Sequence, residues 1–306
     1  MTWFFIALVA PILWAIVNIA DTFLIAKYSE KEKERSSGGL VLFSSFLGIL
    51  IAGIIAIFVA GIFHIPLLDK ILLLISGTLT VIWIILYLFA LETEDVSTIV
   101  PYFLTVPIFG YILGYIFLGE TLTTFQFFGS FVVLFGLVII SINFSGEKRK
   151  IKKKPILYML LACLMVAISG VIFKYVTVEN NFWISSFWEY AGLGLAGLLI
   201  FLFMPKYRAQ FLRMTRIGGK KIFMVNIVTE LMTISGNLLT NFALLLAPVT
   251  MVYLVGSFQP AIVLLLTIIA TRFFPHIVKE NLSPRVLVPK IIAIIIMIIG
   301  SVFLFV

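Results

Sequence analysis

The sequence predicts an all-α integral membrane protein with ten transmembrane helices arranged as two inverted five-helix repeats. Of its 306 residues, 62% are hydrophobic and 12% are charged, whereas a soluble domain typically has about 45–50% and about 25%. Apolar stretches of membrane length recur along the whole chain, and the basic residues gather in a few short loops between them. Two soluble domains of this length would need far more polar surface.

A bilayer-crossing helix needs roughly 20 mostly apolar residues. Cutting the chain at charges, turn residues and polar clusters predicts ten such spans, at 3–26, 38–62, 71–91, 96–118, 123–143, 155–176, 182–204, 222–246, 249–273 and 288–305. The acidic segment 92–95 separates the third span from the fourth. Only Ala247 and Pro248 separate the eighth from the ninth.

The basic residues predict a single orientation. Of the 22 Lys and Arg, only Lys70 and Lys174 lie away from the face that carries the loops after spans one, five, seven and nine. Cytoplasmic loops are enriched in Lys and Arg. We therefore expect a multi-pass plasma-membrane protein with cytoplasmic basic loops and both termini outside.

An internal repeat divides the chain into residues 1–145, a basic cytoplasmic linker at 146–154, and residues 155–306. The sequence Phe-Ala-Leu at 89–91 recurs at 242–244, and the same offset carries Pro107 onto Pro260. Gly-Glu-Thr-Leu-Thr at 119–123 resembles Lys-Glu-Asn-Leu-Ser at 279–283. Five spans per repeat force the two halves into opposite orientations. Inverted repeats are typical of alternating-access carriers, whose site lies near the midplane between the halves.

At these residues the chain resembles the drug/metabolite transporter superfamily, in its ten-helix EamA-type branch. The resemblance rests on the helix-breaking prolines Pro107 and Pro260, on the two turns after them, and on Trp14 to Asn18, which approximates a Trp-Gly-x-x-Asn element. It implies a secondary carrier of a small metabolite or drug-like solute. Two features depart from the family pattern: Lys279 replaces a turn glycine, and the charge count places the termini outside.

The eighth span carries a polar stripe, and its members lie at helical spacing on one face: Asn226, Glu230, Thr233, Asn237 and Asn241. Lipid cannot satisfy an amide or a carboxylate, so the stripe predicts a cavity wall. Hydrogen bonding between helices is the alternative. Glu230 is the candidate for proton coupling, since burial raises the pKa of a carboxyl group toward neutrality. A neutral, hydrogen-bonded glutamic acid is the competing interpretation.

Other intramembrane polar and aromatic residues extend the hypothesised substrate cavity. They are Trp14, Asn18, Trp83, Tyr87, Tyr111, Glu189, Tyr190, Tyr253 and Ser257. Lys174 ends the sixth span opposite Glu189, so we expect an ion pair between them, in which Glu189 is either structural or, with Lys174, a gate. Asp21 is expected to balance Lys27. Aromatic side chains at helical spacing are also typical of packing or interfacial belts.

Several other functions remain open or are disfavoured. A flippase for lipids or lipid-linked precursors would share the repeat and the aromatic residues. A channel is disfavoured because dispersed polar stripes differ from a selectivity ring. His64-x4-Asp69 fits a membrane acyltransferase, but its loop is short, and we expect no enzyme. The sequence has no cluster with metal-ligand spacing and no phosphate-binding loop, so we expect neither a metal nor a cofactor. Gly110 and Gly114 suit close helix contact within the bundle or in a homodimer.

Overall fold

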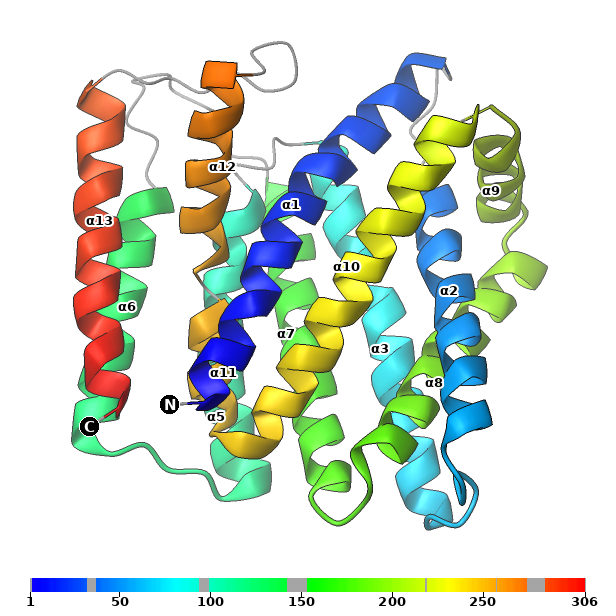
Figure 1. Cartoon of the computed structure of the whole chain (residues 1–306), viewed down its shortest axis with the longest axis horizontal. Helices are drawn as coiled ribbons and strands as arrows, with labels where there is room; N and C mark the ends of the chain where they lie inside the picture. Colours follow the sequence, from blue (N-terminus) through cyan, green and yellow to red (C-terminus); the bar gives the residue numbers. More distant parts are fainter. Residues whose placement is uncertain are drawn as a thin grey trace.

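The computed structural model describes residues 2–31, 37–93, 99–141, 153–217, 219–256, 258–273 and 284–305. Every regular element in these ranges is a helix, and helices make up 91% of the structure. Figure 1 shows the helices side by side in one bundle, with most of them running between two opposite faces. The predicted all-α class is confirmed.

The elements cover all ten predicted spans. In chain order they are α1 (Thr2–Lys31), α2 (Ser37–Phe58), α3 (Leu67–Leu91), η1 (Val100–Thr105), α5 (Val106–Leu118), α6 (Thr124–Ser141), α7 (Lys153–Thr177), α8 (Phe182–Phe203), α9 (Pro205–Ile217), α10 (Gly219–Leu246), α11 (Val249–Gly256), α12 (Gln259–Phe273), α13 (Pro284–Val302) and η2 (Phe303–Phe305).

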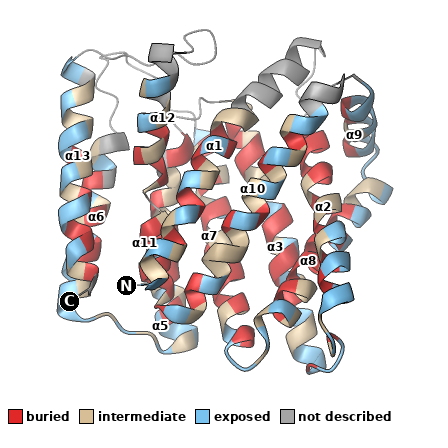
Figure 2. Cartoon of the chain, in the orientation of Figure 1, coloured by how far each residue is buried: buried red, intermediate tan, exposed pale blue. Residues whose placement is uncertain are grey.

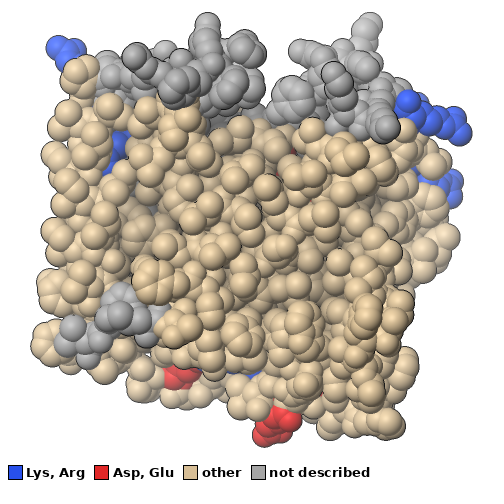
Figure 3. Space-filling view, viewed as in Figure 1, with Lys and Arg blue, Asp and Glu red and all other residues tan. Residues whose placement is uncertain are grey.

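The surface has the charge pattern of a membrane protein. Seven segments of the described chain are long and apolar enough to cross a bilayer, and three shorter apolar helices fall in the other predicted spans. Figure 3 shows a broad band without charged side chains, with Lys and Arg near one margin and Asp and Glu near the other. Lipid-exposed positions carry side chains such as Ile57, Ile116 and Ile298. The chain is therefore an integral membrane protein.

The fourth and ninth spans are both broken at corresponding places. In the fourth, the 3-10 helix η1 gives way to α5 just before Pro107. In the ninth, α11 ends at Gly256, and α12 begins with Gln259 and Pro260. Proline lacks the backbone N–H of a helix interior and clashes with the preceding turn, so it favours the start of a helix. Broken helices of this kind often surround transporter sites.

Packing follows the two-fold pattern that the repeat predicts. α3 packs against α7, and the corresponding helices of the opposite halves, α10 and α1, also pack together. α6 packs against its counterpart α13, α2 against α8, and α5 against α11. In Figure 1 the α6–α13 pair forms one edge of the bundle, and α1 and α10 lie side by side across its front.

Glycines allow α8 to lie directly against α2 and α3. A Cβ on Gly192 would overlap the backbone of Leu74 in α3, and one on Gly77 of α3 would overlap the carbonyl of Glu189. On the α2 side, a Cβ on Gly197 would overlap Ser45. Small residues permit this close approach of helices in membranes. The backbone that carries Glu189 is therefore held on two sides.

The largest departure from the two-fold pattern among the described helices lies between α2 and α10. By the repeat, this pair corresponds to α8 and α3, which pack closely. α2 and α10 lack comparable backbone packing and meet through side chains instead. The Phe43 and Phe223 rings lie 5.7 Å apart, and the Ser44 hydroxyl donates to Glu230. The α2–α10 junction is therefore packed less tightly than its repeat counterpart, the α3–α8 junction.

The sequence did not predict α9, an amphipathic helix on the basic face. It places Tyr207, Gln210 and Met214 against the start of α2, and its basic side chains are exposed. The Gln210 Oε1 accepts a hydrogen bond from Gly38 N at 3.1 Å, and Glu92 accepts one from Ser37 N at 3.2 Å. These bonds satisfy free amides of the first turn of α2. Burial and the nearby Glu92 carboxylate raise the pKa of Tyr207 to about 12, so it stays neutral.

Gly192→Ala is predicted to lower the melting temperature of the detergent-purified protein, because its Cβ has no room against α3. Overpacking typically costs about 1–3 kcal/mol. Gly53→Ala is the matched control, since it lies in the neighbouring helix with nothing within 4 Å of the added Cβ. There the higher helix propensity of alanine should leave the melting temperature unchanged or raised. Equal shifts for the two variants would contradict the packing described above.

Candidate functional site

A cavity of about 170 Å³ lies between the two halves of the chain. Figure 2 shows buried residues along the interior helices around it, among them α3 and α7. Its walls come from both halves but not from the outer pair α6 and α13. The polar and aromatic lining residues are Trp14, Asn18, Asp21, Ser44, Thr80, Trp83, Tyr87, Phe103, Ser169, Glu189, Tyr190, Glu230, Thr233, Asn237, Thr240, Asn241, Tyr253 and Gln259.

Glu230 lies in this cavity on α10, about 16 Å along the helix from Gly219 at 1.5 Å per residue. Its Oε1 accepts a hydrogen bond from the Ser44 hydroxyl of α2. The same hydroxyl lies 3.2 Å from the Leu40 carbonyl. A hydroxyl has one proton to donate. The Ser44 hydroxyl can therefore donate either to an ionised Glu230 or to the Leu40 carbonyl of its own helix, but not fully to both. When Glu230 is protonated, it can itself donate a hydrogen bond to the Ser44 oxygen.

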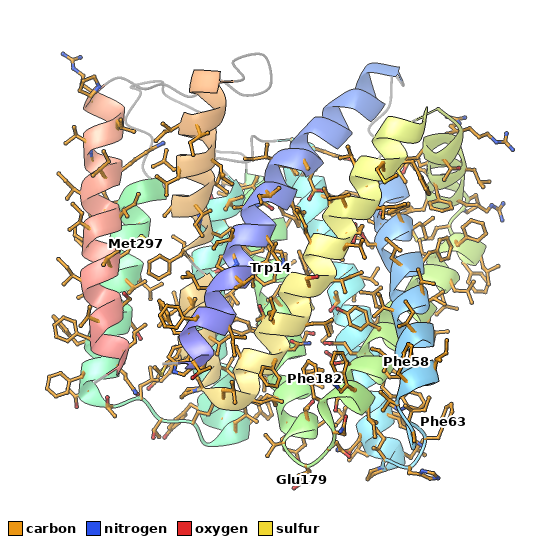
Figure 4. The ribbon with its side chains drawn as sticks, viewed as in Figure 1. Trp14, Phe58, Phe63, Glu179, Phe182 and Met297 are labelled. Carbon is orange, nitrogen blue, oxygen red and sulfur yellow. The ribbon has the colours of Figure 1, made fainter. Side chains whose placement is uncertain are left out.

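Asp21 of α1 is a second carboxyl group in the cavity. It lies close enough to Glu230 and to Tyr87 to interact electrostatically with both. The Tyr87 hydroxyl donates to Asn18 Oδ1 at 3.1 Å, one turn of α1 away. Trp14 lies on the same face of α1, in the middle of the bundle (Figure 4), where Gly236 leaves room for its indole against α10. The packing of α1 against α10 thus brings the Asp21 and Glu230 carboxyl groups together.

Glu189 of α8 forms the other acidic site and is held by neutral donors. The Ser76 hydroxyl donates to its Oε1 at 2.8 Å, and the Asn241 amide donates to its Oε2 at 2.7 Å. Ser169 lies 2.8 Å from Ser76, so α3 and α7 both support the carboxyl group. The side chain is 8% exposed. Its position is thus fixed by three helices while it still faces the cavity.

The predicted ion pair between Lys174 and Glu189 is wrong. Lys174 instead lies 2.5 Å from Glu120 Oε1, in a pair whose side chains are 13% and 14% exposed. Its ammonium group also donates to the Ala247 carbonyl at 2.7 Å, and Glu120 Oε2 accepts from Val249 N at 2.7 Å. Glu120 can reach this position because Gly119 ends α5 in the left-handed conformation, with φ of 64°.

This group, here called the clamp and defined as Glu120, Lys174, Ala247 and Val249, joins the two halves of the chain. Glu120 belongs to the first half and the other three to the second. The Glu120 carboxylate lies at the first free amides of α11, where helix dipoles favour a negative charge. The clamp lies one turn of α7 beyond Gly170, at the end away from the basic face.

Tyr253 packs between α5 and α7 and lines the cavity. A Cβ on Gly110 of α5 or on Gly170 of α7 would overlap its ring. The Tyr253 hydroxyl donates to the Val166 carbonyl at 3.1 Å. Gly110 and its neighbour Gly114 are therefore used in packing within the chain, against Tyr253 and Glu120.

Most of the residues predicted for the site lie in the cavity wall. The exceptions are Tyr111, Asn226 and Ser257. Tyr111 is not among the lining residues; its ring stacks on Tyr115 at 6.5 Å and lies 6.3 Å from Phe127 of α6. Asn226 is buried between helices, 2% exposed, beyond the lining, and Ser257 lies outside the described residues.

Several contributors to the site were not predicted from the sequence, among them Asp21, Ser44, Ser76, Phe103 and Glu120. Ser44 and Ser76 gave no signal, since single serines are common in membrane helices. Glu120 belongs to the Gly-Glu-Thr-Leu-Thr turn, whose sequence indicated a repeat but not a contact with Lys174.

The His64-x4-Asp69 pair shows no acyltransferase arrangement. Asp69 Oδ2 accepts a hydrogen bond from Asn180 at 2.9 Å. His64 is exposed, and no hydrogen bond joins the two residues within the described chain. A metal-binding group of His, Cys, Asp or Glu is likewise absent from that part of the chain.

Residues 1–142 match the model of the EamA-like transporter family. The first half of the chain is thus similar to that family. The resemblance noted from the proline and turn motifs is thus confirmed there, and the EamA-like half contains α1 to α6, with Asp21, Ser44, Tyr87 and Glu120.

The fold extends over the second half as well. A solved structure whose title says only "Crystal structure of protein" superimposes with a TM-score of 0.67 at 14% identity, over 99% of this chain and 96% of that one. At this identity the likeness shows the fold alone. A search of curated proteins found no match.

Glu120→Gln is predicted to lower the melting temperature clearly, because it leaves the Lys174 ammonium without its carboxylate in a largely buried place. Breaking one side of a buried ion pair typically costs about 3–5 kcal/mol. The double variant Glu120→Gln with Lys174→Met should recover part of the loss, since no unpaired charge remains. Additive losses in the double variant would show that the pair does not interact.

Proposed function

We propose that this protein is a secondary active carrier that moves a small metabolite or drug-like solute by alternating access. One observation carries the proposal: the polar and aromatic cavity lies at the junction of two oppositely oriented halves, and broken helices border it. Substrate sites of inverted-repeat carriers occupy this position. The EamA-like match of the first half supports the same function.

The described contacts suggest how access would alternate. The clamp and Tyr253 close the end of the cavity away from the basic face. Toward the basic face, α2 and α10 meet only through side chains such as Ser44 and Glu230. In the opposite state the clamp would open and the α2–α10 junction would close. Lys174 is then a gate residue, although its partner is Glu120.

Glu230 couples this exchange to protons in the proposal. Its hydrogen bond with Ser44 bridges the loosely packed junction between α2 and α10. When Glu230 is ionised, it accepts the hydrogen bond that the Ser44 hydroxyl donates. When Glu230 is protonated, the Ser44 hydroxyl can donate to the Leu40 carbonyl instead. The protonation state of one carboxyl group therefore changes a contact between two helices that would move apart. Such coupling requires the group to exchange its proton in one state only.

The proposal also specifies how the protein is oriented in the membrane. Two modules, 1–145 and 155–306, would sit in the plasma membrane with the linker and other basic loops in the cytoplasm and both termini outside. The basic side chains described near one face, among them Lys153, Arg208 and Arg285, are exposed as that orientation requires. A homodimer would need a face other than Gly110 and Gly114, since both glycines are buried within the chain.

A reconstituted system tests the transport proposal. Uptake by proteoliposomes would be measured for a panel of amines, amino acids and sugar phosphates, with and without a pH gradient. The gradient should raise the accumulation of at least one solute about tenfold. Glu230→Gln should abolish that stimulation, because glutamine carries no exchangeable proton. Glu179→Gln is the matched control, since Glu179 is exposed in the turn between α7 and α8 (Figure 4) and should not matter.

The outcomes separate the candidates. Uptake that responds equally to the gradient in both variants would remove Glu230 from coupling and leave a carrier. An absence of uptake, together with translocation of fluorescent lipid analogues in the same vesicles, would replace the carrier with a flippase.

A further inference from the structure

We propose that the solute is a small organic cation, held between Glu189 at the deep end of the cavity and the Asp21–Glu230 pair nearer the basic face. The inference rests on the proposed transport function and adds the chemical class of its substrate. It is argued from the cavity wall as a whole: its charge, its aromatic surface and the fixed position of Glu189.

The described charged side chains that line the cavity are all acidic. Asp21, Glu189 and Glu230 line the cavity, and no Lys, Arg or His is among its described lining residues. The nearest cation at the deep end, Lys174, is bound by Glu120 and by the Ala247 carbonyl. Carboxylates inside a membrane protein need a proton or a counter-ion. A cationic solute supplies what the chain itself does not provide, whereas an anion would be repelled.

Aromatic rings occupy the wall between the acidic groups. Trp83 lies 6.4 Å from both Tyr87 and Phe103, and the last two rings are 5.8 Å apart. All three line the cavity. The face of an aromatic ring attracts a cation, and the attraction grows when the cation is desolvated. Carboxyl groups and ring faces together favour an ammonium or guanidinium group with a short apolar chain.

Glu189 is arranged as a fixed anchor for such a group. Ser76 donates one hydrogen bond to Oε1 of Glu189, and Asn241 donates one to Oε2. Neither donor carries a charge. A carboxylate can accept about four hydrogen bonds, so capacity remains for an N–H donor. Tyr190 is close enough to interact electrostatically with both Glu189 and Glu230, and it lies in the wall of the cavity. The two acidic sites therefore belong to one continuous space.

Binding can be measured without a transport assay, because Trp14 and Trp83 line the cavity. Tryptophan fluorescence of the purified protein would be titrated with butylammonium, butan-1-ol and butanoate, three solutes of similar size and different charge. Choline and its uncharged isostere 3,3-dimethylbutan-1-ol form a second pair. The two cations should bind at least tenfold more tightly than their alcohols, and butanoate should bind most weakly. Affinity for the cations should fall as the pH is lowered, because protons then compete for the carboxylates.

Variants locate the binding. Glu189→Gln should weaken cation binding at least tenfold and leave the alcohols unaffected, and Glu179→Gln should change neither. Glu230→Gln serves as a second variant if Glu189→Gln fails to fold, as judged by gel filtration and melting temperature. Equal binding of cations and alcohols, tighter binding of butanoate, or no cation binding at all would overturn the proposal.

The result is distinguishable from failure of the transport function. Cations that bind but are not taken up by vesicles would support this site and contradict the carrier. Uptake of neutral or anionic solutes, without binding of cations, would preserve the carrier and contradict this substrate class.

Discussion

A carboxyl group within a bilayer has no partner in the lipid, and the arrangement of this molecule follows from that constraint. Each described intramembrane acid is turned inward. Glu189 takes hydrogen bonds from Ser76 and Asn241, and Glu230 takes one from Ser44. These bonds tie α8 to α3 and α10, and α10 to α2. Residues that would be costly against lipid thus become the contacts that hold the central helices around a cavity.

The same constraint explains why the clamp differs from the cavity. In the clamp, the Glu120 carboxylate has an ammonium partner and a helix N-terminus, so its charge is balanced within the chain. In the cavity, Glu189 and Glu230 take hydrogen bonds from neutral donors, and no Lys, Arg or His is among the described residues that line the cavity with them and Asp21. A balanced group suits a closed gate, and unbalanced groups suit a site that proton or solute must complete. The asymmetry between the tight α3–α8 junction and the looser α2–α10 junction matches this division.

Much of this architecture could be predicted from the sequence because membrane helices obey strong local rules. Composition and span length gave the helices, and Pro107 and Pro260 marked the breaks that the structure contains. The 3.6-residue periodicity placed Glu230, Thr233 and Asn237 on the face that lines the cavity. Helix α9 was missed because it is amphipathic and short, and hydropathy alone does not detect such a helix.

The site pairings could not be predicted because they depend on how helices distant in sequence pack. Lys174 and Glu189 are near each other along the chain, which suggested a pair. However, Lys174 is at the end of α7, and the loop after Gly119 brings Glu120 to it from the other half. The proximity of Asp21 to Glu230 was not predicted for the same reason, since it arises only when α1 packs on α10.

Access to the cavity from each side of the membrane tests alternating access most directly. Cys163 is the only cysteine, so Cys163→Ser with Thr233→Cys places a single thiol in the cavity wall. A membrane-impermeant maleimide would be added to sealed vesicles from one face or the other. With Glu120 and Lys174 intact, the account predicts that the maleimide labels the thiol from the face that carries the basic loops. The added substitutions Glu120→Gln and Lys174→Met should increase labelling from the opposite face. Labelling from one face only, unchanged when the clamp is removed, would contradict it.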